Sequence, residues 1–104
     1  MSEAIVVLCT CGDAAEARRI AQDLVHSRLA ACVNIFPAVE SIYRWQGGIE
    51  TAQEVVILIK TLRERFTDLR QRIIHLHSYD TPEIIAIPVT AAFEKYLAWI
   101  CEGV

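Results

Sequence analysis

The sequence has no apolar run long enough to cross a membrane as a helix. Its continuous apolar runs, such as residues 5–9 and 55–59, are far shorter than the ~20 residues that a membrane-spanning helix requires. The N-terminal Met1-Ser2-Glu3 is acidic rather than basic, so we expect no signal peptide. We therefore expect a cytoplasmic protein that has no membrane partner.

The sequence also lacks an excess of positive charge. Its formal net charge is −3, whereas a domain that binds nucleic acid usually carries a basic patch or stripe. A short run of arginines, from Arg63 to Arg72, is interleaved with Glu64 and Asp68, which is typical of a solvated helix face. We expect no nucleic acid among the partners.

The four cysteines include no C-x-x-C pair, so neither a thioredoxin-type motif nor a zinc ribbon fits. Without an export signal, reduced thiols are expected. Catalytic signatures are missing too, because no serine has nucleophile-elbow glycines and no glycine-rich loop could cradle a phosphate. The sequence predicts that this protein is not an enzyme.

Apolar residues, by contrast, are abundant. They make up 54 % of the 104 residues, against roughly 45–50 % in a typical soluble domain. The length predicts one domain over residues 1–104. The apolar excess indicates surface that is left for a partner chain.

The first half of the chain predicts a strand, a helix and a long hairpin. Residues 5–9 form a short apolar strand, and Asp13 begins a helix that runs to about Ser27. Residues 31–45 and 49–60 predict two long strands joined at Gly47-Gly48, where a tight turn requires positive φ. Pro37 predicts a bend or bulge in the first of these strands.

The second half predicts a helix, a strand and a last helix. Thr61 and Glu64 predict a capping box ahead of an apolar stripe at helical spacing that ends at Leu76. Residues 83–89 predict a strand, and Thr90 is expected to cap a short C-terminal helix. The order β-α-β-β-α-β with an extra helix predicts an α+β, ferredoxin-like fold.

The predicted hairpin is too long for a single small domain. At ~3.3 Å per residue, arms of about twelve residues reach ~40 Å, whereas a 100-residue domain has a radius of gyration of ~13 Å. Part of the hairpin should overhang, exposing strand edges together with Ile42, Tyr43 and Trp45 near its tip. Pairing with sister chains would cover them, so we expect a homo-oligomer.

Several stretches together resemble the CutA family of divalent-cation tolerance proteins. They are Leu29-Ala30-Ala31-Cys32-Val33-Asn34-Ile35, Tyr43-x-Trp45-x-Gly47-x-Ile49-Glu50, Glu54, Lys60-Thr61, His77-x-Tyr79-x-x-Pro82-Glu83-Ile84 and Tyr96-Leu97-x-Trp99. The resemblance covers nearly the whole chain in order. It implies a ferredoxin-like protomer in a tight trimer whose long hairpins pair between subunits, similar in architecture to the PII-type signalling trimers.

The resemblance also implies divalent-cation tolerance and, for some members of the family, copper binding. The ligands proposed there correspond to Cys9 and to two neighbouring histidines in the loop before the last strand. In this sequence His77 occupies the second of those positions and Leu76 the first, so one ligand is lost. His75 lies close by in the sequence and is the candidate that could replace it.

The residues themselves leave two readings of this site open. Cys9 and Cys11 lie two apart, so their thiols share one side of a strand, and thiolates with imidazoles favour Cu(I) or Zn. Alternatively, Cys9 is a buried core thiol and His77 a locally bonded loop residue. The leading interpretation is a cytoplasmic trimer that binds copper, weakly; the alternative is a small-ligand-sensing or partner-binding signalling trimer.

Five polar residues at strand ends form a second candidate site. Their amine, carboxylates and phenols could line a cleft between subunits for a small anion or a metal. Equally, they could be inter-subunit ion pairs, because buried charges at interfaces must be paired. The five residues are Tyr43, Glu54, Lys60, Tyr79 and Glu83.

Overall fold

The structure, a computed structural model, describes residues 3–104. Met1 and Ser2, which contribute to the prediction that there is no signal peptide, lie outside the described residues. Within residues 3–104, every helix is too short or too polar to span a membrane. The prediction of a single domain over residues 1–104 stays a prediction.

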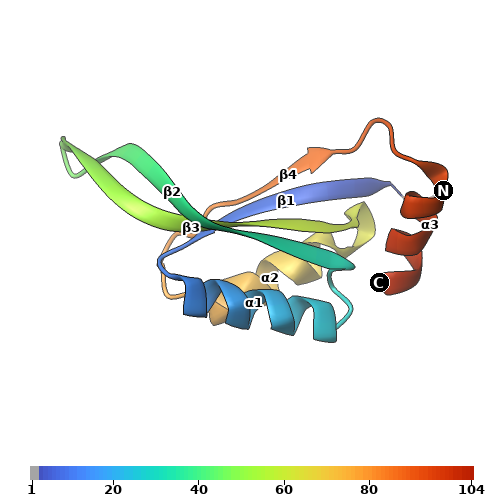
Figure 1. The fold of residues 1–104 in the computed structure, drawn as a ribbon. Coiled ribbons are helices and arrows are strands. Elements are labelled where there is room, and N and C mark those ends of the chain that lie inside the picture. Colours follow the sequence, from blue (N-terminus) through green and yellow to red (C-terminus); the bar gives the residue numbers. More distant parts are fainter. Residues whose placement is uncertain (1–2) are drawn as a thin grey trace.

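Residues 3–104 form four strands and three α-helices (Figure 1). The elements are β1 (Ala4–Cys11), α1 (Ala14–His26), β2 (Cys32–Trp45), β3 (Gly48–Leu62), the 3-10 turn η1 (Arg63–Arg65), α2 (Phe66–Leu76), β4 (Ile84–Pro88) and α3 (Glu94–Gly103). The strands form one sheet in the order β2-β3-β1-β4, and every neighbouring pair is antiparallel. The predicted α+β fold class is confirmed, with an antiparallel sheet.

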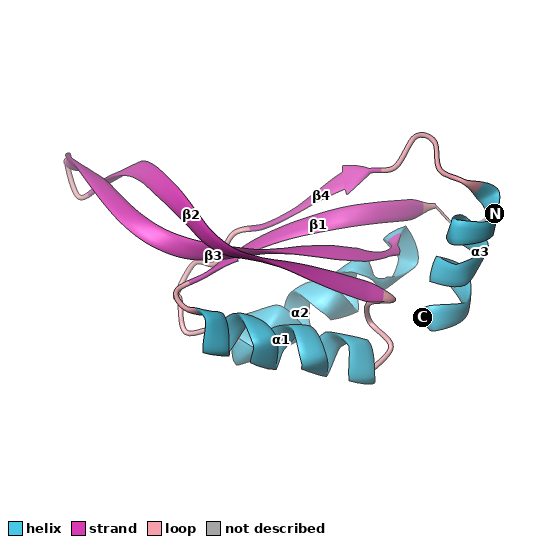
Figure 2. Cartoon of the chain, viewed as in Figure 1, coloured by secondary structure: helices cyan, strands magenta, loops and turns pink. Residues whose placement is uncertain are grey.

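The core lies between the sheet and two helices. Figure 2 shows α1 and α2 side by side on one face of the sheet, with α3 at the end of the sheet where β1 begins. Strand side chains alternate between faces, so Val7 and Cys9 of β1 with Ile57 of β3 are fully buried under the helices. The two helices are joined by a bidentate ion pair of 2.7 Å between Arg72 and Asp23.

The other face of the sheet is apolar and carries neither α1 nor α2. Leu8 of β1 faces Leu58 on one side and Ile85 on the other, and Val6 is paired with Ile87. Ile85 and Ile87 are 51 % and 48 % exposed. A contiguous apolar sheet face is therefore open in the isolated chain.

The hairpin of β2 and β3 extends past the rest of the sheet, as predicted. Residues 55–62 of β3 pair with β1, whereas the described contacts of residues 48–54 within the sheet are with β2 alone. Figure 1 shows this part projecting beyond the helices, and the chain is 45 Å long in that direction. Its apolar side chains include Trp45, which is 58 % exposed.

Two local features of the hairpin follow from backbone chemistry. The register shifts between Phe36 and Val39, which confirms the irregularity predicted at Pro37. The turn lies one residue earlier than predicted: positive φ falls on Gln46 (48°) and Gly47 (81°), and Gly48 already pairs with Trp45. Two positive φ values are what a two-residue type I′ turn requires.

Both predicted threonine caps are wrong. Thr61 lies within β3, because pairing with β1 continues to Leu62, and its hydroxyl donates to the carbonyl of Leu29 at 2.7 Å. The α-helix that follows begins only at Phe66, after the 3-10 turn. The C-terminal helix begins at Glu94, four residues after Thr90, with no side-chain cap.

Replacement of Thr61 by the isosteric valine tests this new assignment. Thr61 is fully buried, so Thr61→Val leaves the Leu29 carbonyl without its partner and should lower the free energy of unfolding by about 1–3 kcal/mol. Chemical denaturation measures the change. Glu64→Gln is the control, because Glu64 is exposed and makes no cap; destabilisation by Glu64→Gln with none by Thr61→Val would restore the capping box.

Candidate functional site

Two thiols and one imidazole meet beneath the sheet. Cys9 and Cys11 are both on the helix-facing side of β1, and His77 follows α2, with its backbone N–H donating to Ile73 at 2.8 Å. One ligand atom from each lies within 4.8 Å of the others, and all three residues are buried. The structure thus assembles the predicted pair Cys9 and His77 and adds Cys11.

Both ring nitrogens of His77 have backbone partners. Nδ1 accepts a hydrogen bond from the N–H of Tyr79 at 3.0 Å, so in the neutral ring the proton is on Nε2. Nε2 then donates to the carbonyl of Thr10 at 2.8 Å. This arrangement connects β1 to the loop after α2 and orients the imidazole.

The pKa values of the two thiols are shifted in opposite directions. The hydrogen bond to Cys11, followed by burial, raises the pKa of Cys9 far above its usual range, and the carboxylates of Glu83 and Glu16 add to the effect. The same hydrogen bond lowers the pKa of Cys11. Because the thiolate is the reactive form, Cys9 is a protonated, unreactive thiol at neutral pH.

The donor set fits a soft metal ion. With metal–sulfur bonds of ~2.3 Å, two sulfurs on opposite sides of one ion lie at most about 4.6 Å apart. The observed limit of 4.8 Å therefore requires only a small contraction. Two thiolates and an imidazole suit Cu(I) or Zn better than Mg or Ca, provided that His77 gives up one backbone hydrogen bond.

The other residues considered for this site lie apart from it. His75 is exposed on α2 and is not part of the group. Leu76, which stands where the resemblance places a histidine, packs against the main core. The spacing of Cys9 and Cys11 was the signal for the third donor, because residues two apart on a strand point to the same side.

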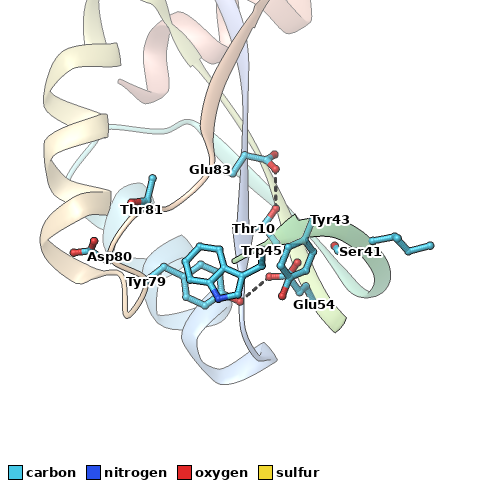
Figure 3. A pocket seen from close by; sticks show the side chains of 10 residues that line it. Thr10, Ser41, Tyr43, Trp45, Glu54, Tyr79, Asp80, Thr81 and Glu83 are labelled. Carbon is cyan, nitrogen blue, oxygen red and sulfur yellow. Dashed lines mark hydrogen bonds between the residues drawn. The ribbon is translucent and has the colours of Figure 1, made fainter. Parts of the chain in front are cut away.

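An open groove of about 900 Å³ lies where the hairpin leaves the sheet (Figure 3). One wall is the hairpin and the other is the loop between α2 and β4. Figure 3 shows Glu54, Tyr43 and Trp45 of the hairpin close to Tyr79 of the loop, whereas Asp80 lies apart from them. The lining residues are Thr10, Ser41, Ile42, Tyr43, Trp45, Glu54, Tyr79, Asp80, Thr81 and Glu83.

Two hydrogen bonds connect the walls of the groove. The Tyr79 hydroxyl donates to Glu54 at 2.6 Å, and the Thr10 hydroxyl donates to Glu83 at 3.2 Å. Burial and the bond to Glu54 raise the pKa of Tyr79, so its hydroxyl stays protonated. A Cβ at Gly12 would lie 3.3 Å from this hydroxyl, so the glycine leaves room for the tyrosine.

Four of the five residues predicted for the cleft line this groove, and Lys60 does not. Glu54 and Lys60 are six residues apart on one strand, or about 20 Å. Lys60 pairs with Val6, and its ammonium lies over the ring of Tyr96, 5.5 Å from the centroid. The structure therefore places the lysine at the α3 end of the sheet, where it contributes no charge to the groove.

Glu16 holds the loop against the start of α1. Its carboxylate accepts from the N–H of Ser78 at 2.9 Å and from that of Gly12 at 3.3 Å. The backbone N–H of Glu16 donates to the carboxylate of Asp13 at 2.8 Å. Burial alone would raise the pKa of Glu16, but the hydrogen bonds from Ser78 and Gly12 outweigh it and lower the pKa. The carboxylate is thus ionised and positions the segment that carries His77 and Tyr79.

This lowered pKa gives a pH-dependent contribution to stability. The charge of Glu16 stabilises the fold above its unfolded pKa near 4.5, and the contribution is lost as pH falls through the lower folded value. Glu16→Gln should lower the free energy of unfolding by about 1–2 kcal/mol at pH 7, with the deficit shrinking at acid pH. Denaturation at several pH values measures it; an unchanged deficit at low pH, or the same profile for Glu64→Gln, would contradict this role.

Comparison with known proteins finds one family throughout. A family model described as "CutA1 divalent ion tolerance protein" matches residues 5–103. The divalent-cation tolerance protein CutA of Thermus thermophilus is 47 % identical over 98 residues, which cover 94 % of this chain and 95 % of the relative. A chloroplastic CutA protein of Arabidopsis thaliana is 38 % identical over 96 residues, 92 % of this chain and 53 % of the relative.

Solved structures agree with the sequence comparisons. The periplasmic divalent cation tolerance protein CutA from Archaeoglobus fulgidus superposes with a TM-score of 0.94 at 40 % identity, covering 96 % of this chain and 97 % of that chain. CutA1 from Oryza sativa has a TM-score of 0.95 at 37 % identity, covering 97 % and 93 %. The names of these relatives refer to more than one compartment.

Proposed function

Because the chain belongs to the CutA1 family of divalent ion tolerance proteins, we propose that it is a cytoplasmic homotrimer that binds copper, as Cu(I), and so contributes to divalent-cation tolerance. The observation that carries the metal proposal is the buried group of Cys9, Cys11 and His77, within 4.8 Å of one another. The four cysteines are free thiols, which supports a reducing compartment.

The chain's own residues supply sequestration rather than catalysis. The ion would be held by the sulfurs of Cys9 and Cys11 and by the imidazole of His77, where burial excludes water and other ligands. Binding must displace the thiol protons, and the raised pKa of Cys9 opposes this. The affinity is therefore modest and rises with pH. The Cys9 thiol is protonated, and both ring nitrogens of His77 are already hydrogen-bonded to the backbone. Neither group is therefore available as a nucleophile or base, which supports a role without enzymatic activity.

Cu(I) titration of variants tests the metal site. Cys9→Ser, Cys11→Ser and His77→Ala each remove a donor and should weaken binding at least about tenfold, or by 1.4 kcal/mol. Competition with a Cu(I) chelator under reducing conditions measures the affinity. His75→Ala is the matched control, because His75 is exposed and outside the group; a loss in this control with none in the cysteine variants would move the site to the surface.

The trimer and its ferredoxin-like protomer are proposed on two features of the fold. The sheet face of Leu8, Leu58, Ile85 and Ile87 is open in one chain, and contiguous exposed apolar patches mark interaction sites. The overhanging half of β3 also leaves backbone groups free for a further strand, as edge strands do. In a trimer, the sheet face of one chain could pack against that of another, and the hairpin of one chain could pair with the free edge of β3 in the next. Both exposed surfaces would then be covered.

Light scattering coupled to size exclusion tests the assembly. We expect three times the 11.7 kDa mass of one chain. Ile87→Lys places a charge on the open sheet face and should reduce the mass to that of smaller species. Ile74→Lys is the control, since Ile74 is similarly exposed, at 49 % against 48 %, but lies on α2. A wild-type protein that runs as a folded single chain would contradict the proposal.

A second candidate function is favoured by the groove. A signalling trimer that senses a small ligand or binds a partner requires a concave surface near a movable element, and the groove joins the hairpin to the loop before β4. This candidate does not depend on metal. Native mass spectrometry of protein purified without chelators tests it: a bound small molecule or partner that persists in Cys9→Ser supports this candidate, and a trimer with nothing bound contradicts it.

A further inference from the structure

We propose that Glu16 is a positioning residue that latches the loop of residues 77–83 over the buried group of two thiols and one imidazole, and so sets the rate at which an ion enters and leaves that group. The inference rests on the proposed copper binding and adds the regulation of the same site. Glu16 would not touch the ion; it would act through the loop that carries His77.

The buried group is closed to solvent. Cys9 and Cys11 have no exposed surface, and His77 is only 9 % exposed. β1 is paired on both sides, with β3 and with β4, so it cannot move without breaking the sheet. Residues 77–83 are neither helix nor strand, and segments of this kind open at the lowest cost in free energy. An ion therefore reaches the sulfurs when this loop moves.

The contact with Glu16 is the one that can hold the loop while an ion is exchanged. An imidazole that turns to an ion gives up a backbone partner, whereas the bond to Glu16 uses the backbone of the loop and does not depend on the imidazole. The bond between Tyr79 and Glu54 is exposed to water. The hydrogen bonds that join the loop to β1, α1 and β3 are those of His77 with the Thr10 carbonyl, Ser78 with Glu16, Tyr79 with Glu54 and Glu83 with the Thr10 hydroxyl.

The Glu16 carboxylate connects the residues that follow two of the donors. Gly12, which follows Cys11, donates its N–H to Oε1 at 3.3 Å. Ser78, which follows His77, donates its N–H to Oε2 at 2.9 Å. Glu16 is only 5 % exposed, and hydrogen bonds to an ionised group are strong where water is excluded. A single side chain thus fixes the end of β1 relative to the loop.

Glutamine cannot replace this carboxylate. Each oxygen of Glu16 accepts one N–H, whereas a glutamine amide faces one N–H with its oxygen and the other with an NH₂ group that only donates. In Glu16→Gln either Gly12 or Ser78 therefore loses its partner, although the size of the side chain is kept. The connection is broken, and we expect the loop to open at least about tenfold more often.

Alkylation of the metal-free protein measures the opening. Iodoacetamide reaches Cys9 and Cys11 only when the loop is open, and peptide mass spectrometry separates their segment from that of Cys101, which is exposed and serves as the reference. The label on the buried pair should appear at least about tenfold faster in Glu16→Gln than in the wild type at every pH tested. The labelling rate of Cys101 should not change.

Two control variants separate the latch from charge and from stability. Asp13→Asn removes a carboxylate that, like Glu16, raises the pKa of Cys11. Asparagine caps a helix as well as aspartate does, and the hydrogen bond of Asp13 is to the N–H of Glu16 rather than to the loop. Thr61→Val lowers the stability from the opposite end of β1. Labelling in both should stay within about twofold of the wild type.

Transfer of Cu(I) to and from a chelator measures the consequence for the ion. Under reducing conditions, stopped-flow absorbance of the Cu(I)–chelator complex gives the release rate with excess chelator and the uptake rate from a weaker one. In Glu16→Gln both rates should rise by a similar factor, at least about tenfold, while Kd stays within about threefold of the wild type. The loss of a donor in Cys11→Ser should instead change Kd.

The outcomes distinguish the latch from the copper site. Cu(I) binding with unchanged labelling and transfer rates in Glu16→Gln overturns the latch and leaves the copper proposal standing. Equal acceleration in Asp13→Asn or Thr61→Val also overturns the latch, because charge or general stability would then be the cause. Faster labelling of Glu16→Gln in a protein that binds no Cu(I) overturns the copper proposal and with it the gating of an ion, but not the attachment of the loop to Glu16.

Discussion

The unequal lengths of two neighbouring strands determine much of this structure. β3 extends from residue 48 to residue 62, but β1 pairs with only residues 55–62. The remainder can pair with β2 and must leave the body of the sheet, because β1 ends and the chain turns into α1. The groove opens at this divergence, with Glu54, the last residue of β3 before the β1 pairing begins, on one wall.

Successive side chains of β1 point to opposite faces of the sheet. The strand therefore lies between the buried thiols on one face and the groove on the other. Cys9 and Cys11 point to the helices, where the hydrogen bond between them and then burial raise the pKa of Cys9. Thr10 between them lines the groove and donates to Glu83. The backbone of Thr10 accepts from His77. One short segment thus supplies two donors to the buried group, one wall residue to the groove and an acceptor that orients the imidazole.

Sequence patterns predicted the features that depend on period and length. The shared side of Cys9 and Cys11 follows from a two-residue period, and the overhang follows from strand length compared with domain size. The patterns failed where long-range pairing decided the outcome. Thr61 resembles a helix cap, but pairing with β1 keeps it in a strand. Lys60 and Glu54 are six residues apart on β3, or about 20 Å, so one chain cannot bring both to the same groove.

The buried group and the groove also share a structural element, the short segment that carries His77 and Tyr79. The N–H of Tyr79 donates to Nδ1 of His77, and the side chain of the same tyrosine forms the groove wall and donates to Glu54. A ligand that fixes Tyr79 therefore favours the present ring orientation, whereas any ion that takes Nδ1 must first break that bond. Coupling between two binding equilibria is reciprocal. Its sign here follows from one hydrogen bond: each occupant disfavours the other to the extent that this bond is lost.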